Sequence, residues 1–254
     1  MSEIIEGKFE YLKQGDGPPL ILLHGLFGAL SNFDPLVEKM KSKFTVYTLR
    51  LPIYSLPLIS IGLKSLAKHL HGFIKFKGFA KVHLLGNSLG GHVGLVYATR
   101  HLDKIESLTL TGSSGLYENA FGGTFPRRED KNFLRERITT TFYDPNMVTD
   151  ELVDECYNAV NDRGKLIRIL HMAKSAIRQN MRGEIEKMDV PTCLIWGEND
   201  EITPPRVAKE FHEKMPLSEL FWIPKCGHAP MMEHPETFNQ IYWGWMVKQK
   251  FISS

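Results

Sequence analysis

The sequence predicts an α/β fold in which helices cover both faces of a mostly parallel β-sheet. Short apolar runs alternate with helix-forming stretches as far as Gly112, the alternation then stops, and strand-like runs resume near residue 190. Strands joined by helices of this length need right-handed crossovers, which produce a parallel sheet buried on both faces. A chain of 254 residues with 43% hydrophobic residues is long enough to bury one such core.

The chain is expected to begin with two strands joined by a turn. The segment KFEYLK (8–13) alternates between apolar and polar residues, GDGPP (15–19) has the composition of a turn, and an apolar run then reaches His24. Alternation is typical of a half-buried strand and a continuous apolar run of a fully buried one. We therefore predict a hairpin that leads into a buried strand.

The remaining core elements follow from the same periodicities. Further strands are predicted at FTVYTL (44–49), KVHLLG (81–86), IESLTLTG (105–112), VPTCLIWG (190–197) and SELFWIP (218–224). Apolar residues at helical spacing predict helices over 31–42, 59–76 and 90–102, one between the last two strands, and a final one over about 235–250.

Residues 115–187 have a different character and predict a helical cap inserted after the sixth strand. The core would then comprise residues 1–114 and 188–254. Thr149 is a candidate N-cap, because acidic residues that favour the positive end of a helix follow it directly. An insertion of this kind is expected at the edge of the sheet that carries the ligand site. Four apolar residues fit either a pocket lining or the interior of the cap: Tyr117, Phe121, Phe125 and Met172.

Charge and cysteine content exclude several classes of protein. The 31 basic and 29 acidic side chains give a net charge of +2 without a dense basic block, which predicts neither a nucleic-acid nor a membrane partner. An N-terminus with acidic residues and no apolar signal segment predicts a cytoplasmic location. The scattered Cys156, Cys193 and Cys226 form no CxxC pair, so neither disulfides nor a metal site are expected. A small-molecule substrate is expected, and the sequence does not indicate the oligomeric state.

The segment HLLGNSLGGH (83–92) places Ser88 between glycines, directly after a predicted strand and before a predicted helix. Its central part, GNSLG (86–90), matches the G-x-S-x-G pattern of a nucleophile elbow. Such a turn holds the central residue in a strained backbone conformation, and its glycines let neighbouring backbone pack closely. Ser88 is therefore a candidate nucleophile, and an ordinary turn serine is the alternative.

A serine nucleophile needs a histidine base and a carboxylate that orients it. Asp200 follows the predicted strand 190–197, and His228 follows the strand 218–224. Glu198 is a competing carboxylate in the same loop as Asp200. Other histidines are expected to pack or to form local hydrogen bonds, among them His24, His92 and His234.

Four segments, HGLFG, GNSLGG, WGENDEITP and GHAPMMEHPE, resemble the oxyanion, nucleophile, acid and base segments of the α/β-hydrolase superfamily, in that order and over nearly the full chain. The resemblance implies a triad of Ser88, Asp200 and His228, acyl-enzyme chemistry, and no cofactor or metal. It also implies an oxyanion hole formed by the backbone N–H groups of Leu26 and Leu89. Epoxide- and haloalkane-cleaving relatives carry Asp in place of Ser88, so those reactions are not expected.

Within the superfamily, the segments GNSLGG, TGSSGL and FYDPNMVTDELVDECY are similar to those of carbon–carbon bond hydrolases of meta-cleavage pathways, and related small esterases are also close. This resemblance implies three substrate-binding residues: Phe27, Asn32 and Met231. Two segments depart from it, because Ala229 replaces the usual Trp and RLPIYSLP (50–57) replaces a glycine-containing loop that begins with Asp. Arg163 is either a carboxylate-binding cap residue or a solvated helix charge.

We therefore expect a serine hydrolase that acts on a small, largely apolar ester or on a diketone-type carbon–carbon substrate. Two alternatives remain. One is a cofactor-free perhydrolase activity of the haloperoxidase kind, in which peroxide intercepts the acyl-enzyme. The other is a non-catalytic, ligand-binding member of the fold.

Overall fold

The computed structural model describes residues 3–28, 30–117 and 127–253. Within these residues, eight strands form one sheet in the spatial order β1-β2-β4-β3-β5-β6-β7-β8. The strands are β1 (Ile4–Glu6), β2 (Phe9–Gln14), β3 (Pro19–Leu23), β4 (Thr45–Leu49), β5 (Val82–Asn87), β6 (Ile105–Thr111), β7 (Thr192–Gly197) and β8 (Ser218–Ile223). From β4 to β8 along the sheet all neighbours pair in parallel, whereas β2 pairs antiparallel with both β1 and β4.

The predicted hairpin is wrong in its pairing, because β4 lies between β2 and β3. The antiparallel partner of β2 is β4, with Tyr11 opposite Leu49, and the hairpin is formed by β1 and β2. The turn after β2 packs on the start of β4: a Cβ on Gly15 would lie 2.2 Å from the Phe44 carbonyl oxygen. Since β3 is buried and apolar, it takes a parallel neighbour on each side instead of the half-exposed β2.

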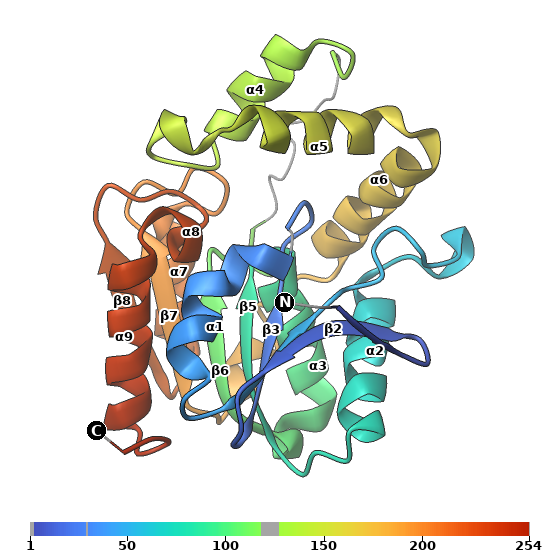
Figure 1. Ribbon diagram of the computed structural model, residues 1–254. Helices are drawn as coiled ribbons and strands as arrows, with labels where there is room; N and C mark the ends of the chain where they lie inside the picture. The colour runs from blue at the N-terminus through green and yellow to red at the C-terminus, as the bar shows by residue number, and fades with distance from the viewer. Residues whose placement is uncertain (1–2, 29, 118–126, 254) are drawn as a thin grey trace.

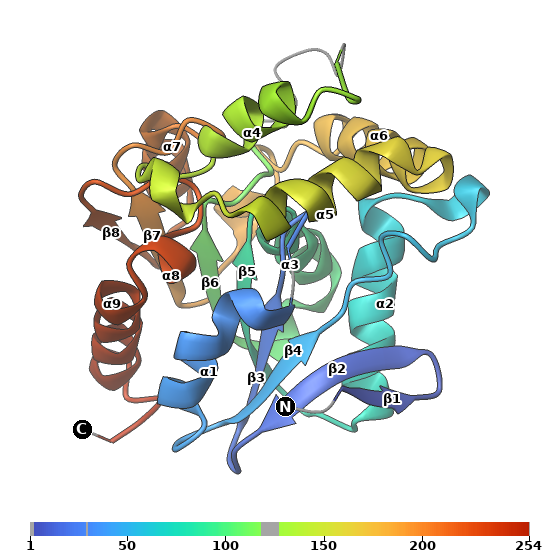
Figure 2. The ribbon, with the colours of Figure 1, turned by 45° about the horizontal axis from the view of Figure 1, so that its top comes forward.

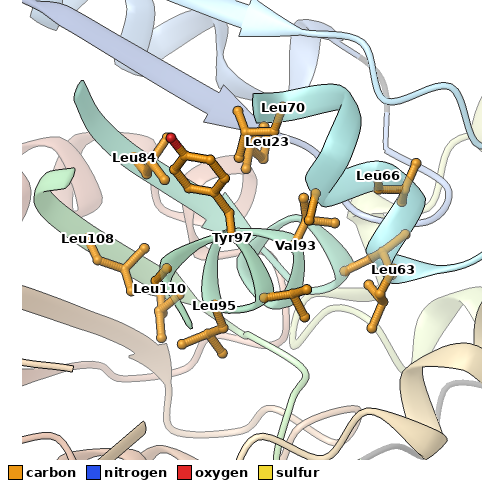
Figure 3. Close-up of a cluster of buried hydrophobic side chains, with 14 of the residues drawn as sticks. Leu23, Leu63, Leu66, Leu70, Leu84, Val93, Leu95, Tyr97, Leu108 and Leu110 are labelled. Atoms are coloured by element: carbon orange, nitrogen blue, oxygen red, sulfur yellow. The ribbon is translucent and has the colours of Figure 1, made fainter. Parts of the chain in front are cut away.

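Helices cover both faces of the sheet (Figures 1 and 2). Buried residues of α2 (Leu63–Phe76), α3 (Leu89–His101) and α7 (Pro205–Lys214) belong to one core cluster, and those of α1 (Asp34–Met40) and α9 (Pro235–Lys248) to the other. Figure 3 shows Tyr97 and Val93 of α3 among Leu84 of β5 and Leu70 of α2. The short α8 (Pro230–Glu233) precedes α9. The described part of the chain also contains the 3-10 turns η1 (Leu30–Phe33), η2 (Leu58–Ser60), η3 (Leu102–Lys104), η4 (Pro145–Met147) and η5 (Ile185–Lys187).

Among the described residues between β6 and β7, three helices lie over the carboxyl ends of the strands (Figure 1), and we refer to this part of the chain as the cap. They are α4 (Lys131–Thr139), α5 (Asp150–Asn161) and α6 (Arg163–Arg178). The predicted N-cap is confirmed, because Thr149 Oγ1 accepts a hydrogen bond from the Leu152 N–H at 3.2 Å. No helix in the described ranges combines the length and apolar character needed to cross a membrane.

The four apolar residues of the insertion are only partly accounted for. Met172 is fully buried and joins the same core cluster as α2 and α3, and Tyr117 packs against that cluster. Phe121 and Phe125 lie outside the described residues. Helix α6 therefore packs on the body of the sheet as well as in the cap, and the predicted cap boundaries at 115 and 187 stay a prediction.

Candidate active site

Ser88 occupies the sharp turn between β5 and α3. Its backbone has φ 52° and ψ −118°, a conformation that costs a non-glycine residue energy and persists only where surrounding contacts enforce it. Those contacts are present: the Ser88 N–H donates to the Thr111 carbonyl at 3.1 Å, and the Ser88 carbonyl accepts from the N–H groups of His92 and Ser114 at 3.2 and 3.3 Å. The strained turn and its strand-to-helix context match the predicted elbow.

The glycines on each side of Ser88 are required by close backbone packing. A Cβ on Gly86 would lie 2.4 Å from the backbone nitrogen of Gly91, and one on Gly90 would lie 2.1 Å from the carbonyl oxygen of Leu23. Both separations are far below van der Waals contact, so no other residue fits without moving the backbone. These glycines let β5, α3 and the end of β3 meet at the elbow.

Asp200 lies in the loop after β7 and is held by a dense set of hydrogen bonds. Its side chain is buried, Oδ1 accepts from the N–H groups of Ile202 and Thr203 at 2.9 and 2.8 Å, and Oδ2 accepts from Thr203 Oγ1 at 2.8 Å. Asp200 Oδ2 also lies 2.9 Å from His228 Nδ1. The competing Glu198 is exposed, so the structure pairs Asp200 and not Glu198 with the histidine.

His228 follows β8 and is buried at 6% exposure. Its Nδ1 contacts the Asp200 carboxylate, which leaves Nε2 as the ring nitrogen that can accept a proton. The backbone N–H of His228 donates to the Thr141 carbonyl of the cap at 2.7 Å. Gly112, at φ 49°, allows the close approach of this histidine, because a Cβ there would lie 2.9 Å from Nδ1.

Asn87 connects the serine turn to the histidine loop, a role that the sequence did not reveal. The Asn87 side-chain Nδ2 donates to the Thr111 carbonyl at 3.0 Å and to the His228 carbonyl at 3.1 Å. The side chain is buried, so both hydrogen bonds are shielded from water. Asn87 therefore fixes the position of the His228 backbone relative to the turn that carries Ser88.

Ser88 and His228 line the same cavity of about 340 Å³ beneath the cap, hereafter the site cavity. Leu26, Phe27 and Asn32 line it as well. Six further apolar residues of its wall come from the cap: Phe133, Leu134, Ile138, Phe142, Leu152 and Val160. The wall is thus largely apolar, and its polar residues come both from the loops around Ser88 and His228 and from the cap, which supplies Arg137 and Glu155.

One expected substrate contact, Met231, lies outside the cavity wall, and Arg163 is a solvated helix charge, one of the two alternatives that the sequence left open. Met231 is 2% exposed and packs in the core cluster of α1 and α9, whereas its neighbour Met232 lines the site cavity. Arg163 is exposed at the start of α6 and is not part of the cavity wall, but Arg137 of α4 is. Side-chain direction depends on the helical turns of α8 and of the cap, and those turns could not be placed from the sequence to within one residue.

The oxyanion segment is fixed by His24 and by the 50–57 loop. His24 Nδ1 donates to the Gly25 carbonyl at 2.8 Å and Nε2 accepts from the Leu51 N–H at 3.0 Å. Burial lowers the pKa of His24 to about 4, so the ring is neutral and this pair of hydrogen bonds is stable at neutral pH. Tyr54 Oη donates to the Leu26 carbonyl at 3.4 Å.

The two predicted oxyanion residues lie on either side of Ser88. A Cβ added to Gly25 would be 3.4 Å from the Ser88 Cβ, which brings the segment that carries Leu26 next to the serine. Leu89 is the first residue of α3, where backbone N–H groups lack a helical acceptor. Both N–H groups are therefore in segments that contact the serine turn.

His92 and His234, like His24, form hydrogen bonds to nearby groups, as predicted. His92 Nδ1 lies 3.2 Å from Ser114 Oγ and its Nε2 lies 2.8 Å from the Gln179 carbonyl. His234 Nε2 lies 2.8 Å from the Lys225 carbonyl.

In the 50–57 loop, Arg50 Nε lies 2.6 Å from Glu10 Oε1, and the same guanidinium also pairs with Glu3. This loop therefore takes a course set by ion pairs to the N-terminal strands. Arg50 thus binds acidic residues at the N-terminal edge of the sheet and does not line the site cavity.

Comparisons with known proteins agree with this arrangement. A family model described as the alpha/beta hydrolase family matches residues 20–241. The chain is 29% identical to 2-hydroxy-6-oxo-6-(2'-aminophenyl)hexa-2,4-dienoic acid hydrolase of Metapseudomonas resinovorans, over 96% of this chain and 89% of that protein. It is 30% identical to pimeloyl-[acyl-carrier protein] methyl ester esterase of Neisseria meningitidis serogroup B, over 87% of this chain and 90% of that protein.

Among solved structures, an α/β hydrolase enzyme from the metagenome of lagoon sediments at Mar Chica, Morocco, is 41% identical, with a TM-score of 0.83. The match covers 98% of this chain and 100% of that one. The strand order, the serine turn after β5 and the match of the family model over most of the sequence lead to one conclusion: the chain belongs to the alpha/beta hydrolase family.

Proposed function

We propose that this protein is a serine hydrolase in which Ser88 is the nucleophile, His228 the general base and Asp200 the residue that orients it. The observation that carries the proposal is that the strained Ser88 lines one cavity with His228, whose ring is paired with the buried Asp200. A serine held in a strained turn beside a histidine–carboxylate pair is the arrangement that nucleophilic catalysis needs.

The proposed reaction begins with attack of Ser88 Oγ on a substrate carbonyl carbon while His228 Nε2 takes the hydroxyl proton. The Leu26 and Leu89 N–H groups stabilise the oxyanion that forms, each by about 3–4 kcal/mol where such donors are preorganised. Collapse of this intermediate expels the alcohol or carbanion, which receives the proton from His228. Water activated by the same histidine then hydrolyses the acyl-enzyme. Asp200 remains ionised and stabilises the imidazolium in both steps.

The cavity supports a substrate with an apolar acyl part and an anionic end. Its wall is apolar except near Ser88 and around Arg137, Glu155 and Glu201. The Arg137 guanidinium lies over the Phe133 ring at 5.9 Å and forms no ion pair with any described residue, so it is available to a carboxylate. Of the two relatives named above, one acts on a dienoic acid, which has a carboxylate, and the other on a pimeloyl methyl ester. Small esters and dienoate diketones are therefore the two substrate classes that we propose.

A fluorophosphonate probe tests the nucleophile directly. Native protein is expected to be labelled, and Ser88→Ala is expected to lose the label, while Ser42→Ala, a change at an exposed serine, should be labelled like native protein. A panel of p-nitrophenyl esters of graded acyl length, run beside a dienoate diketone, separates the two substrate classes. Labelling of Ser88→Ala equal to that of native protein would contradict the proposal, and peroxide-dependent acyl transfer faster than hydrolysis would favour a perhydrolase instead.

A further inference from the structure

A second hollow lies between α2, α3 and the segment from Arg178 to Glu184 that follows α6. Its volume is about 680 Å³, against about 340 Å³ for the site cavity, and the two share no lining residue. We call it the α2–α3 groove. Figure 2 shows α2 and α3 side by side on the face of the sheet away from α1 and α9. The proposed hydrolase reaction makes no use of this groove.

The charges that line the α2–α3 groove are almost all positive. Four cations come from three separate helices: Lys64 and Lys68 of α2, Arg100 of α3 and Arg178 of α6. None of the four forms an ion pair with a described residue. The acidic residue of the lining, Glu184, is already paired with Lys187 at 3.5 Å. Like charges that converge on one concave surface raise the local concentration of anions, so this part of the surface favours an anionic ligand.

Two imidazole rings lie among the cations of the groove. The rings of His71 and His101 are stacked, with centroids 4.2 Å apart and planes 16° from parallel. Their neighbour Tyr97 belongs to the core, where its side chain lies among leucines of β5 and α2 (Figure 3). The imidazole N–H groups are hydrogen-bond donors, so the two histidines add polar contacts for an anion to those of the cations.

The charged groups around His101 are mostly cationic. Burial lowers the pKa of His101, and the neighbouring His71, Arg100 and Lys104 lower it further, outweighing the opposite effect of Asp103. Cations close enough to disfavour a protonated imidazole are close enough to attract an anion bound beside it.

The wall that carries Arg178 is held in place by the core. The Gln179 carbonyl accepts from His92 Nε2 at 2.8 Å, Asn180 Nδ2 donates to the Leu116 carbonyl at 3.0 Å, and the Met181 N–H donates to the Gly115 carbonyl at 2.7 Å. The backbone that positions Arg178 is therefore fixed before any ligand arrives. A preorganised wall reduces the entropy cost of binding.

We propose that the α2–α3 groove binds a small molecule that carries a chain of phosphoryl groups, such as a nucleoside polyphosphate or an inorganic polyphosphate. A single oxyanion is too small to reach cations that come from three helices around a groove of this size. Arginine pairs with phosphate through two parallel N–H donors and lysine acts as a point charge, and both are present. The imidazoles of His71 and His101 add further donors. This proposal is independent of the hydrolase reaction at Ser88.

Isothermal titration calorimetry of the full chain tests the proposal, with inorganic tripolyphosphate, ATP and adenosine as separate probes. We expect tripolyphosphate and ATP to bind, adenosine not to bind, and affinity to fall as ionic strength rises. The same titrations on Ser88→Ala should give the same affinities, because the groove does not include the proposed nucleophile. Binding of adenosine as tight as that of ATP would contradict recognition of phosphate.

A double variant locates the site. Lys68→Gln with Arg178→Gln should weaken tripolyphosphate binding at least about tenfold, because two charge-assisted contacts are lost. The matched control, Lys39→Gln with Lys209→Gln, removes the same net charge from exposed positions on α1 and α7 and should keep the native affinity. The proposal is overturned if native protein gives no binding heat with either polyphosphate at low ionic strength, or if the two double variants lose affinity equally while circular dichroism shows both folded.

Discussion

Replacing Thr203 by valine would remove one hydrogen bond from Asp200 and keep nearly the same side-chain shape. Thr203 Oγ1 donates to Asp200 Oδ2 at 2.8 Å, and both residues are 2% exposed. A hydrogen bond to a charged group contributes about 1.5–3 kcal/mol. Because the two backbone N–H donors and His228 stay in place, the variant should fold, and its free energy of unfolding should fall by that amount. Urea denaturation followed by tryptophan fluorescence measures this change.

The same substitution separates the positioning of Asp200 from its charge. Even if the whole 1.5–3 kcal/mol were lost from the transition state, kcat/KM for a p-nitrophenyl ester would fall only about 10- to 150-fold. Asp200→Asn, which removes the charge itself, is expected to cost about 10⁴-fold in kcat. A folded Thr203→Val protein as inactive as Asp200→Asn would refute this reasoning. So would a Thr203→Val protein whose urea midpoint of unfolding equals that of the native protein.

Three further substitutions test the glycine packing at the elbow, the role of Arg137 in the site cavity and the titration of the buried His69. Gly90→Ala should destabilise the fold by at least about 1–3 kcal/mol in a thermal-melting assay, because its Cβ would lie 2.1 Å from the Leu23 carbonyl oxygen. The control is Gly94→Ala, which should lose no stability in the same assay because the nearest atom to its Cβ lies at 3.4 Å. Arg137→Gln should raise KM about tenfold for a dienoate substrate and leave KM for a neutral ester unchanged in steady-state kinetics; equal effects on both would exclude a carboxylate contact. Burial lowers the pKa of His69 from 6.5 to about 4, so the unfolded chain binds more protons between those pH values and stability falls as pH falls through that window. His69→Phe should reduce the pH dependence of urea unfolding there by about 1.4 kcal/mol per pH unit, and an unchanged slope would show that this ring titrates normally.

The order of elements and the place of the site residues could be predicted because both depend on local sequence. A strand followed by a glycine-flanked serine, and two later strands followed by Asp200 and His228, put those residues at the same edge of a parallel sheet whatever the loops do. Pairing between distant strands is not local. The position of β4 between β2 and β3 depends on which strands must be paired on both sides, and the hydrophobic periodicity of the sequence does not contain that information.

The supporting residues were beyond prediction for a related reason. The Asn87 side chain acts through a hydrogen bond to the His228 carbonyl, and the Thr203 hydroxyl through its contacts with Asp200 and His228; both are side chains that turns commonly contain. Which of Met231 and Met232 lines the cavity, and which arginine of the cap does so, depends on the rotation of helices whose starting residues the sequence leaves uncertain by a residue or more. The motif thus identifies the candidate reacting residues, while their support is visible only in three dimensions.

The hydrogen bond from the His228 N–H to the Thr141 carbonyl has a consequence for engineering this enzyme. A Cβ on Gly227 would lie 2.5 Å from that same carbonyl oxygen, so the turn that follows α4 and the loop that carries His228 are in direct backbone contact. A cap taken from a relative to change substrate preference would have to reproduce this contact at residues 141 and 142, because otherwise the new cap would displace His228. Substitutions confined to the inner faces of α4 and α5 change the shape of the cavity and leave this contact intact, so they are the safer route to altered specificity.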